Sequence, residues 1–370
     1  MVYLDNAATT FLKPKSVYKA IEKAIKLYAA NPGRSGHREA YKAMEAIYEA
    51  RCSVSELFNA PGPESVVFTY NATYALNIAI KSLISEKCHV IISDMEHNSV
   101  LRPINKLRDS IGVEYSVFDS SKPNLFFEIE EKIRPDTRFI VTTLRSNVTG
   151  RDIDIHAIAQ IKKKYGIGVI IDASQAAGHK SIDFRSIDCD AMACPGHKGL
   201  FGISGSGFAI FKDKHLKNSV IEGGSGNDSL NPSMPDLLPE AYEAGTLGVA
   251  GILSVDAGIK FINKVGVLEI SSKLDELTNR CLQMLNDVSS VKIVEGANGI
   301  ISVSANGFSN YELADRLNKS RICIRNGLHC APLAHKTLNT IESGTVRISF
   351  SYFNKTSDID KLYRCIKGIK

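Results

Sequence analysis

Short apolar segments alternate with amphipathic segments over the first two thirds of the chain. The apolar segments have the length of strands and lie near residues 66–69, 89–92, 115–118, 138–143, 167–171, 190–193 and 206–211. Between most of them, apolar residues recur at helical spacing, for example over 73–84, 98–109 and 154–165. Strands alternating with helices predict an α/β fold with a seven-stranded, mostly parallel sheet covered on both faces.

Two amphipathic helices are predicted before the first of these strands. The apolar residues on one face of the first helix are Val17, Ile21, Ala24 and Ile25. Those on one face of the second are Tyr41, Met44, Ile47 and Tyr48.

A loop rich in small and polar residues, EGGSGNDSLNPSMP at 222–235, follows the last predicted strand. Loops of this length are often functional. A helical pattern near 249–288 then leads into a smaller α+β region. We therefore expect a large domain over 1–260 and a small domain over 261–370, with the first residues, about 15 of them, packing against the small domain.

The composition is that of a soluble globular protein. Of the 370 residues, 44% are hydrophobic and 23% are charged, and no apolar run approaches the roughly 18 residues of a membrane helix. The start, MVYLDNAATT, lacks the basic and apolar regions of a secretory signal, so we expect a cytoplasmic protein without a membrane partner.

The charges and cysteines narrow the function classes further. The net charge of +5 is dispersed, and its one basic cluster, 162–164, follows a helical pattern, so a helix end explains it better than nucleic-acid binding does. None of the eight cysteines forms a CxxC pair or has zinc-finger spacing. We therefore expect reduced thiols and no metal site.

Residues able to carry chemistry follow several of the predicted strands, where ligands bind in open parallel sheets. They are Thr73 in NATYALN, His97 in DMEHNS, Asn147 in RSNVTG, Asp172 at the end of GIGVIID, and His197 and Lys198 in CPGHKGLFG. Each has a structural alternative: a plain N-cap for Thr73, an N-cap or loop carboxylate for Asp172, and a structural role for His97.

Taken together, these side chains suit pyridoxal phosphate. That cofactor needs a lysine for a Schiff base, an acid opposite its ring nitrogen and a helix N-terminus for its phosphate. Lys198, Asp172 and Thr73 supply the three. The glycines around Lys198 let a short loop direct one amine at one carbon, and the same amine can then move a proton.

The chain resembles the class V aminotransferase-like enzymes that use pyridoxal phosphate (fold type I), and among them the cysteine desulfurases and selenocysteine lyases. The matching stretches run from residue 3 to about residue 354. They are YLDNAATT, NATYALN, MEHNSV, RSNVTG, IIDASQAAGH, PGHKGLFG, EAGT, RNGLHCAP and GTVRISFSYFN.

The resemblance implies a role for each matching position. Lys198 forms the Schiff base, Asp172 pairs with the pyridine nitrogen, Gln175 contacts the ring hydroxyl and His97 stacks on the ring. Thr73 and His197 hold the phosphate together with Thr246 from the second subunit of a homodimer. Asn147 and Arg347 hold the substrate carboxylate, with Arg325 beside them, and Cys330 is the nucleophile that takes the sulfur.

Two of these roles also follow from local sequence. Cys330 lies after His329, five residues after Arg325 and just before a helix start at Pro332, which are conditions that depress a thiol pKa; the alternative is a buried, inert thiol. Arg347 lies in an alternating strand pattern, where its planar fork suits a carboxylate; the alternative is a structural salt bridge.

The chain departs from the family pattern at several positions. Pro195 stands where a Ser or Thr is frequent, Asn71 replaces a common Gly, Leu144 replaces a frequent His, and Leu247 follows Thr246 where Pro is usual. Ile203 and Ser204 replace a turn that commonly contains Pro. None of these changes removes the Lys, the Asp or the Cys, and we expect them to affect cofactor affinity and substrate preference.

These features predict a pyridoxal-phosphate-dependent cysteine desulfurase. It would convert L-cysteine to L-alanine, hold the sulfur on Cys330 as a persulfide and pass it to an acceptor protein that comes to the site. Selenocysteine lyase, with selenocysteine as substrate, and class V aminotransferase are the enzymatic alternatives. A dimeric scaffold in a sulfur relay, without turnover, is the non-enzymatic one.

Overall fold

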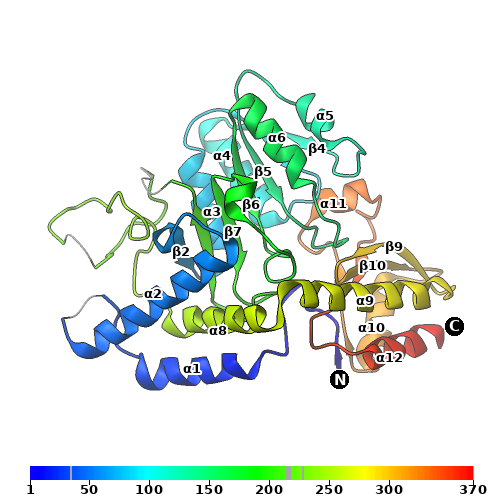
Figure 1. The fold of residues 1–370 in the computed structure, drawn as a ribbon. Coiled ribbons are helices and arrows are strands. Elements are labelled where there is room, and N and C mark those ends of the chain that lie inside the picture. Colours follow the sequence, from blue (N-terminus) through cyan, green and yellow to red (C-terminus); the bar gives the residue numbers. More distant parts are fainter. Residues whose placement is uncertain (34–35, 214–217, 227–228, 370) are drawn as a thin grey trace.

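The described chain forms a seven-stranded sheet and a four-stranded sheet, each covered by helices, and a further pair of short strands (Figure 1). The computed structural model describes residues 1–33, 36–213, 218–226 and 229–369. The large sheet has seven strands in the order β2-β8-β7-β6-β5-β3-β4. They are β2 (Val66–Thr69), β3 (His89–Ser93), β4 (Glu114–Phe118), β5 (Thr137–Thr143), β6 (Gly168–Asp172), β7 (Ala191–Pro195) and β8 (Gly207–Phe211).

The predicted α/β fold and its seven strands are confirmed. Neighbouring strands from β4 to β7 pair in parallel, and only β8 runs antiparallel, to both β7 and β2. All residues of β3, β7 and β8 are buried. Continuous apolar strands of this kind are expected because helices cover both faces of the sheet.

Helices cover the two faces unequally. Helices α3 (Ala72–Leu83) and α4 (Asn98–Ile111) pack on one face, while α2 (Arg38–Phe58), α6 (Ile155–Tyr165) and α8 (Val249–Val265) belong to the core of the other. The remaining helical elements of this part are α1 (Lys15–Leu27), η1 (Pro63–Ser65), α5 (Leu125–Glu130) and α7 (Phe184–Ile187).

The smaller sheet has the strand order β12-β13-β10-β9 and lies beside the large one (Figure 1). Its strands are β9 (Val291–Ala297), β10 (Ile300–Ala305), β12 (Arg325–Gly327) and β13 (Thr345–Ser349). Its helices are α9 (Val267–Asn286), α10 (Asn310–Lys319), α11 (Pro332–Thr337) and α12 (Thr356–Lys367).

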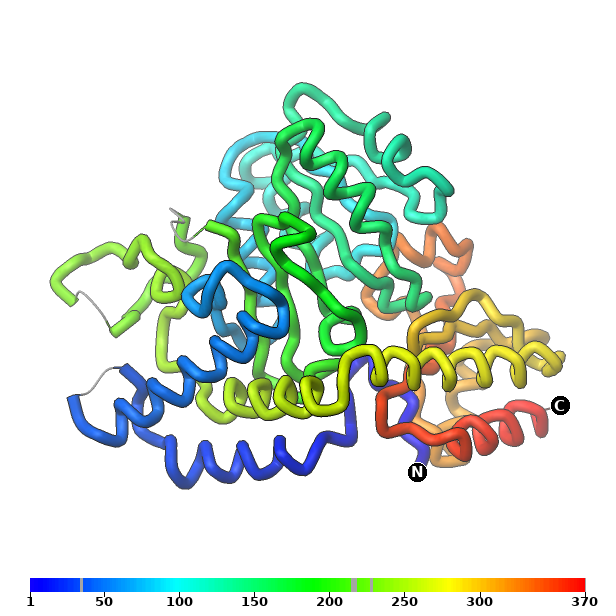
Figure 2. The backbone as a smooth tube through the Cα atoms, viewed as in Figure 1, coloured from blue at the N-terminus to red at the C-terminus, as the bar shows by residue number. Residues whose placement is uncertain are grey.

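The N-terminal segment begins in this smaller part of the molecule. Strand β1 (Val2–Tyr3) pairs in parallel with β11 (Ile322–Cys323), and both chain ends lie on the same side of the molecule (Figure 2). From there the chain passes the end of β13 and reaches α1. The N-terminal residues therefore lie between the two sheets.

The structure corrects the expected helix faces. In α2, Tyr41, Met44 and Tyr48 are exposed, whereas the buried side is formed largely by small residues such as Ala43 and Ala50. In α1, Ile25 is exposed to 66%. The buried alanines let α2 pack closely against α8, which leaves the large apolar side chains on the outside.

Two further expectations concern the region after β8. The helical pattern over 249–288 is two helices, because Gly266, with φ of +95°, ends α8. The expected domain boundary at residue 260 therefore lies inside α8. The described part of the loop 222–235 contains no helix or strand, and residues 227–228 of it lie outside the described residues. No described helix has both the length and the hydrophobicity needed to cross a membrane.

Candidate active site

Lys198 lies in a tight turn directly after β7. The N–H of Gly196 donates to the Ser206 carbonyl (2.8 Å), and the N–H of Phe201 donates to the Lys198 carbonyl (2.9 Å). A side chain at Gly199 would collide with the Ala177 carbonyl, so this turn packs too closely for any other residue. The glycines therefore hold the backbone of Lys198 in place.

The amine of Lys198 lies near the carboxylate of Asp172 but forms no ion pair with any described residue. Burial lowers the pKa of Lys198 to about 8, and the charge of Asp172 works in the opposite direction. A lysine with this pKa is partly neutral at pH 7 and can act as a nucleophile or base.

Asp172 ends β6 at the same edge of the sheet and is buried. One carboxylate oxygen accepts the N–H of Ser174 (2.9 Å), which leaves the other oxygen available to a ligand. Asp172 caps no helix, so the N-cap alternative is wrong. Gln175 lies three residues later and donates to the Ala7 carbonyl (3.0 Å).

Thr73, Ser99 and His97 form a chain of polar contacts. The Thr73 hydroxyl lies 2.8 Å from the Ser99 hydroxyl, which lies 2.8 Å from Nδ1 of His97. Nδ1 also accepts the N–H of Ser99 (3.0 Å), so it carries no proton. Burial lowers the pKa of His97 to about 4, and its ring is neutral at pH 7 with the proton on Nε2.

The N-cap of α3 is Asn71, not Thr73. The Asn71 side chain accepts the N–H of Tyr74 (3.1 Å). The capping alternative for Thr73 is therefore wrong, and its hydroxyl is available at the helix N-terminus. The departure at Asn71 also has a structural purpose, since a glycine there would provide no side-chain cap.

Asn147 and Arg347 meet at the other end of the cavity. Arg347 is 1% exposed, and its guanidinium donates to the Asn147 carbonyl (3.0 Å) and to the carboxylate of Asp5 (2.9 Å). The structural salt bridge considered for Arg347 is therefore present. Its Nε is buried without a hydrogen-bond partner, and the residue also lines the cavity. The Asn147 amide donates to the His329 carbonyl (2.8 Å).

Arg325 lies directly opposite Arg347 on the neighbouring strand. Two like charges in register destabilise a sheet unless an anion lies between them. The guanidinium of Arg325 lies 3.6 Å from Sγ of Cys330. The turn that carries the thiol is unusual, because both His329 and Cys330 have positive φ, at +49° and +57°.

These residues surround one cavity of about 300 Å³, between the carboxyl ends of the large sheet and the edge of the small one. This volume is at the lower end of the range for small-molecule sites. The predicted residues that line it are Thr73, His97, Asn147, Asp172, Gln175, His197, Lys198, Arg325 and Arg347. Pro195 also lines it, whereas Cys330 lines an adjoining cavity.

Comparison with known proteins agrees with this geometry. The aminotransferase class-V family model matches residues 2–362. The chain belongs to the aminotransferase class-V family. It is 32% identical to a probable cysteine desulfurase of Methanothermobacter thermautotrophicus over 100% of this chain and 94% of that protein. It is 30% identical to a probable cysteine desulfurase of Streptomyces coelicolor over 100% of this chain and 92% of that protein.

Solved structures of cysteine desulfurases have a similar fold. The apo cysteine desulfurase of Thermococcus onnurineus has a TM-score of 0.89 and 26% identity, covering 99% of this chain and 94% of that one. The cysteine desulfurase CsdA of Escherichia coli has a TM-score of 0.88 and 26% identity, covering 98% of this chain and 93% of that one.

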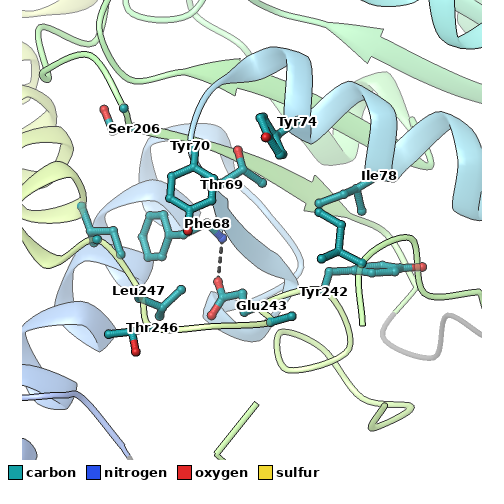
Figure 3. A pocket seen from close by; sticks show the side chains of 15 residues that line it. Phe68, Thr69, Tyr70, Tyr74, Ile78, Ser206, Tyr242, Glu243, Thr246 and Leu247 are labelled. Atoms are coloured by element: carbon teal, nitrogen blue, oxygen red, sulfur yellow. Dashed lines mark hydrogen bonds between the residues drawn. The ribbon is translucent and has the colours of Figure 1, made fainter. Parts of the chain in front are cut away.

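Thr246, like Cys330, is a predicted site residue that does not line the Lys198 cavity of this class-V chain. It is exposed and lies in the loop before α8, where it lines a separate apolar pocket with Leu247, Tyr70 and Phe68 (Figure 3). The loop is anchored by Glu243, whose carboxylate accepts the N–H of Phe68 (2.6 Å) and pairs with the buried Arg51.

The N-terminal segment was expected to pack against the small domain, but its contacts with the turn of Lys198 were not predicted, although YLDNAATT carries part of the family resemblance. Thr9 lies 3.0 Å from Nδ1 of His197, and the Thr10 hydroxyl donates to the Lys198 carbonyl (2.8 Å). Burial lowers the pKa of His197 to about 4. The segment therefore supports the lysine turn, and its density of short polar residues is the signal that could have indicated this.

The contacts of Glu96, the residue before His97, were also not predicted from the sequence. Its Oε1 accepts the N–H of Thr143 (2.8 Å) and the hydroxyl of Ser93, and its Oε2 is buried without a partner. Burial raises the pKa of Glu96 to about 8. The carboxyl group is therefore mostly protonated at neutral pH and ties the ends of β3 and β5 together.

Proposed function

We propose that this protein is a pyridoxal-phosphate-dependent cysteine desulfurase that converts L-cysteine to L-alanine and keeps the sulfur on Cys330 as a persulfide. The observation that carries the proposal is the contact of the Cys330 thiol with Arg325 at the edge of the cavity that holds Lys198 and Arg347. The probable cysteine desulfurases among its relatives support it.

The residues present fit pyridoxal phosphate. Lys198 offers an amine with no ion-pair partner among the described residues, and Asp172 offers a carboxylate oxygen for a protonated ring nitrogen. Thr73, at the N-terminus of α3, and His197 would hold the phosphate, and His97 and Gln175 would contact the ring. When bound, the cofactor supplies an electron sink for the charge left when the substrate α-proton is removed.

The carboxylate of L-cysteine would bind between the two arginines. Nε of Arg347 is a buried donor without a partner, and Arg325 faces it across the strands. Both arginines line the Lys198 cavity, and a carboxylate bound there would relieve the repulsion between the two guanidinium groups. This placement supports a carboxylate substrate in either the cysteine desulfurase or the selenocysteine lyase reaction.

Lys198 and Cys330 would perform the two transfers. The amine of Lys198, with its lowered pKa, takes the α-proton. The Cys330 thiolate attacks the substrate sulfur, so an S–S bond forms as the C–S bond breaks. Return of a proton to the carbon skeleton gives alanine. The sum is cysteine plus one enzyme thiol giving alanine plus one enzyme persulfide, and no external oxidant is needed.

A homodimer is also part of this proposal. Thr246 is exposed and lies outside the Lys198 cavity of its own chain, as expected if it serves a second subunit. Close to it, Met44 and Tyr48 of α2 expose apolar surface around a cavity that Thr246 also lines. Sedimentation equilibrium tests this state, and a monomer at micromolar concentration argues against it.

The main test uses the purified protein loaded with pyridoxal phosphate. Cys330→Ala should retain the visible absorption band of the bound cofactor and lose alanine production from L-cysteine. Cys365→Ala, which removes a thiol on α12, is the matched control and should keep full activity. Full alanine and sulfide production by Cys330→Ala overturns the role of the thiol. A selenocysteine lyase would keep its activity on selenocysteine in that variant, because a selenol is already ionised.

A further inference from the structure

A second cavity adjoins the Lys198 cavity on the outer side of Cys330. It measures about 340 Å³. Its lining residues are Thr73, Asn77, Lys81, His97, Asn98, Ser99, Arg102, Pro103, Lys106 and Cys330. Three of the ten are Lys or Arg, and none is Asp or Glu. The charged side chains that line the cavity with the Cys330 thiol are therefore all positive.

The three cations come from two neighbouring helices and form no ion pair with another described residue. Lys81 belongs to α3, and Arg102 and Lys106 lie one turn apart on α4. None of the salt bridges between described residues involves any of the three, although 18 cations elsewhere in the described chain take part in one. Unpaired like charges around a cavity attract an anionic partner.

Cys330 lies at the boundary between the two cavities. Arg325, which contacts its sulfur, lines the Lys198 cavity. Cys330 itself lines the second cavity, which we call the basic cavity after its three cations. The carbonyl of Cys330 accepts the N–H of Asn98 (2.7 Å), and Pro332 starts α11 two residues later. The turn is short and fixed at both ends, so the thiol cannot travel far with its sulfur.

We propose that the basic cavity is the docking site for a sulfur-acceptor protein whose receiving cysteine is flanked by acidic side chains. This inference rests on the proposed function. The thiolate of the acceptor attacks the outer sulfur of the Cys330 persulfide. The bond between the outer sulfur and the Cys330 sulfur breaks. The acceptor leaves as a persulfide and Cys330 returns to a thiolate, so the electrons balance without a further reactant.

The position of the charges favours a protein over a small anion. Arg102 and Lys106 line the cavity and are exposed to solvent, so a bound macromolecule can contact them. Charges at a rim steer and align an opposing surface, and their effect is strongest on the association rate. L-cysteine would use the Lys198 cavity and the acceptor the basic one, so the two partners reach Cys330 from different sides.

The test follows sulfur transfer in the loaded holoenzyme. The enzyme is first treated with L-cysteine, alanine is quantified, and the persulfide is measured by mass spectrometry after desalting. It is then mixed with one of two pentapeptides that have a central cysteine and either four acidic residues or four lysines. The peptides are used at equal thiolate concentrations, and transfer is expressed per loaded persulfide.

We expect the acidic peptide to accept sulfur at least about ten times faster than the basic one at low salt, with the preference shrinking as salt is added. Arg102→Glu combined with Lys106→Glu should abolish or reverse this preference. Arg102→Gln with Lys106→Gln is a milder variant that should reduce it. Lys163→Glu, the same charge change at an exposed position of α6, should leave it intact.

The outcomes separate this inference from the proposed function. Absence of alanine and persulfide in the first step contradicts the desulfurase itself. Normal loading with equal transfer to both peptides, or a preference that survives both double variants, overturns the docking site. A small anionic thiol, 2-mercaptoethanesulfonate, serves as a third acceptor. If it outpaces the acidic peptide and depends on the same two residues, the cavity serves a small molecule and the protein partner is wrong.

Discussion

The carboxylate of Asp5 lies 2.9 Å from the guanidinium of Arg347, and this pair joins the N-terminal segment to a central strand of the small sheet. Arg347 is 1% exposed and faces Arg325 across the strands, so Asp5 neutralises charge at a place where two cations meet. The pair holds the guanidinium in one orientation and leaves its Nε free.

Neutralising Asp5 should therefore destabilise the protein. Asp5→Asn keeps a hydrogen-bond acceptor but leaves the buried Arg347 without its counter-ion, for which we expect a loss of about 1–3 kcal/mol. Thermal unfolding checks this. Asp360→Asn, in an exposed pair with Arg280, is the control and should cost less than about 1 kcal/mol. Equal effects of the two variants would contradict a special role for Asp5.

The lowered pKa of Lys198 predicts the pH dependence of Schiff-base formation. The reactive form is the neutral amine, so the rate with added pyridoxal phosphate should rise with pH and level off above about pH 8. An ordinary lysine would still be gaining reactivity near pH 10. Stopped-flow absorbance of the cofactor-free protein measures this rate, and Lys198→Ala gives the background. A midpoint near 10 would show that the amine is not perturbed.

Glu96 should make stability depend on pH. Its pKa is raised from the ordinary value to about 8, so the stability that its proton provides is complete below about pH 4.5 and is lost progressively as the pH rises to about 8. Glu96→Gln, which mimics the protonated acid, should flatten the fall of the unfolding midpoint across this window. Glu312→Gln, on the exposed start of α10, should leave the slope unchanged. An unaltered slope in Glu96→Gln would mean that Glu96 is ionised in the fold.

The turn after β7 that carries Lys198 should not tolerate a methyl group at Gly199. Gly199→Ala places a carbon against the Ala177 carbonyl, and we expect a loss of about 1–3 kcal/mol together with slower Schiff-base formation. Gly248→Ala is the matched control, because no atom lies within 4 Å of the place its methyl group would occupy and its φ of −79° suits alanine. Thermal unfolding and cofactor absorbance report the two effects. Normal cofactor binding by Gly199→Ala would show that the turn can move.

The period of the apolar residues was sufficient to predict the large sheet. All seven strands and the helices α3, α4 and α6 follow from local sequence, because a strand buried on both faces must be continuously apolar and a covering helix must repeat its apolar residues every three to four positions. The same logic places Asp172 and Lys198 at one edge, since parallel strands bring their carboxyl ends together.

Local sequence did not determine which helical faces are buried, which residue caps α3, or how Arg347 is paired. Tyr41, Met44 and Tyr48 share the helical spacing of a buried face, yet they are exposed, and the residues that α2 buries are others such as Ala43 and Ala50. Asp5 and Arg347 are separated by 342 residues, and no periodic pattern links positions so far apart.

The sequence by itself determined the fold class and the kinds of chemical groups along one sheet edge, because both depend on patterns within a few residues. The tertiary structure decided how those groups are partnered. The partners of these groups depend on contacts among the N-terminal segment, the large sheet and the small sheet. These contacts orient Arg347, support the turn of Lys198 and place Cys330 between two adjoining cavities.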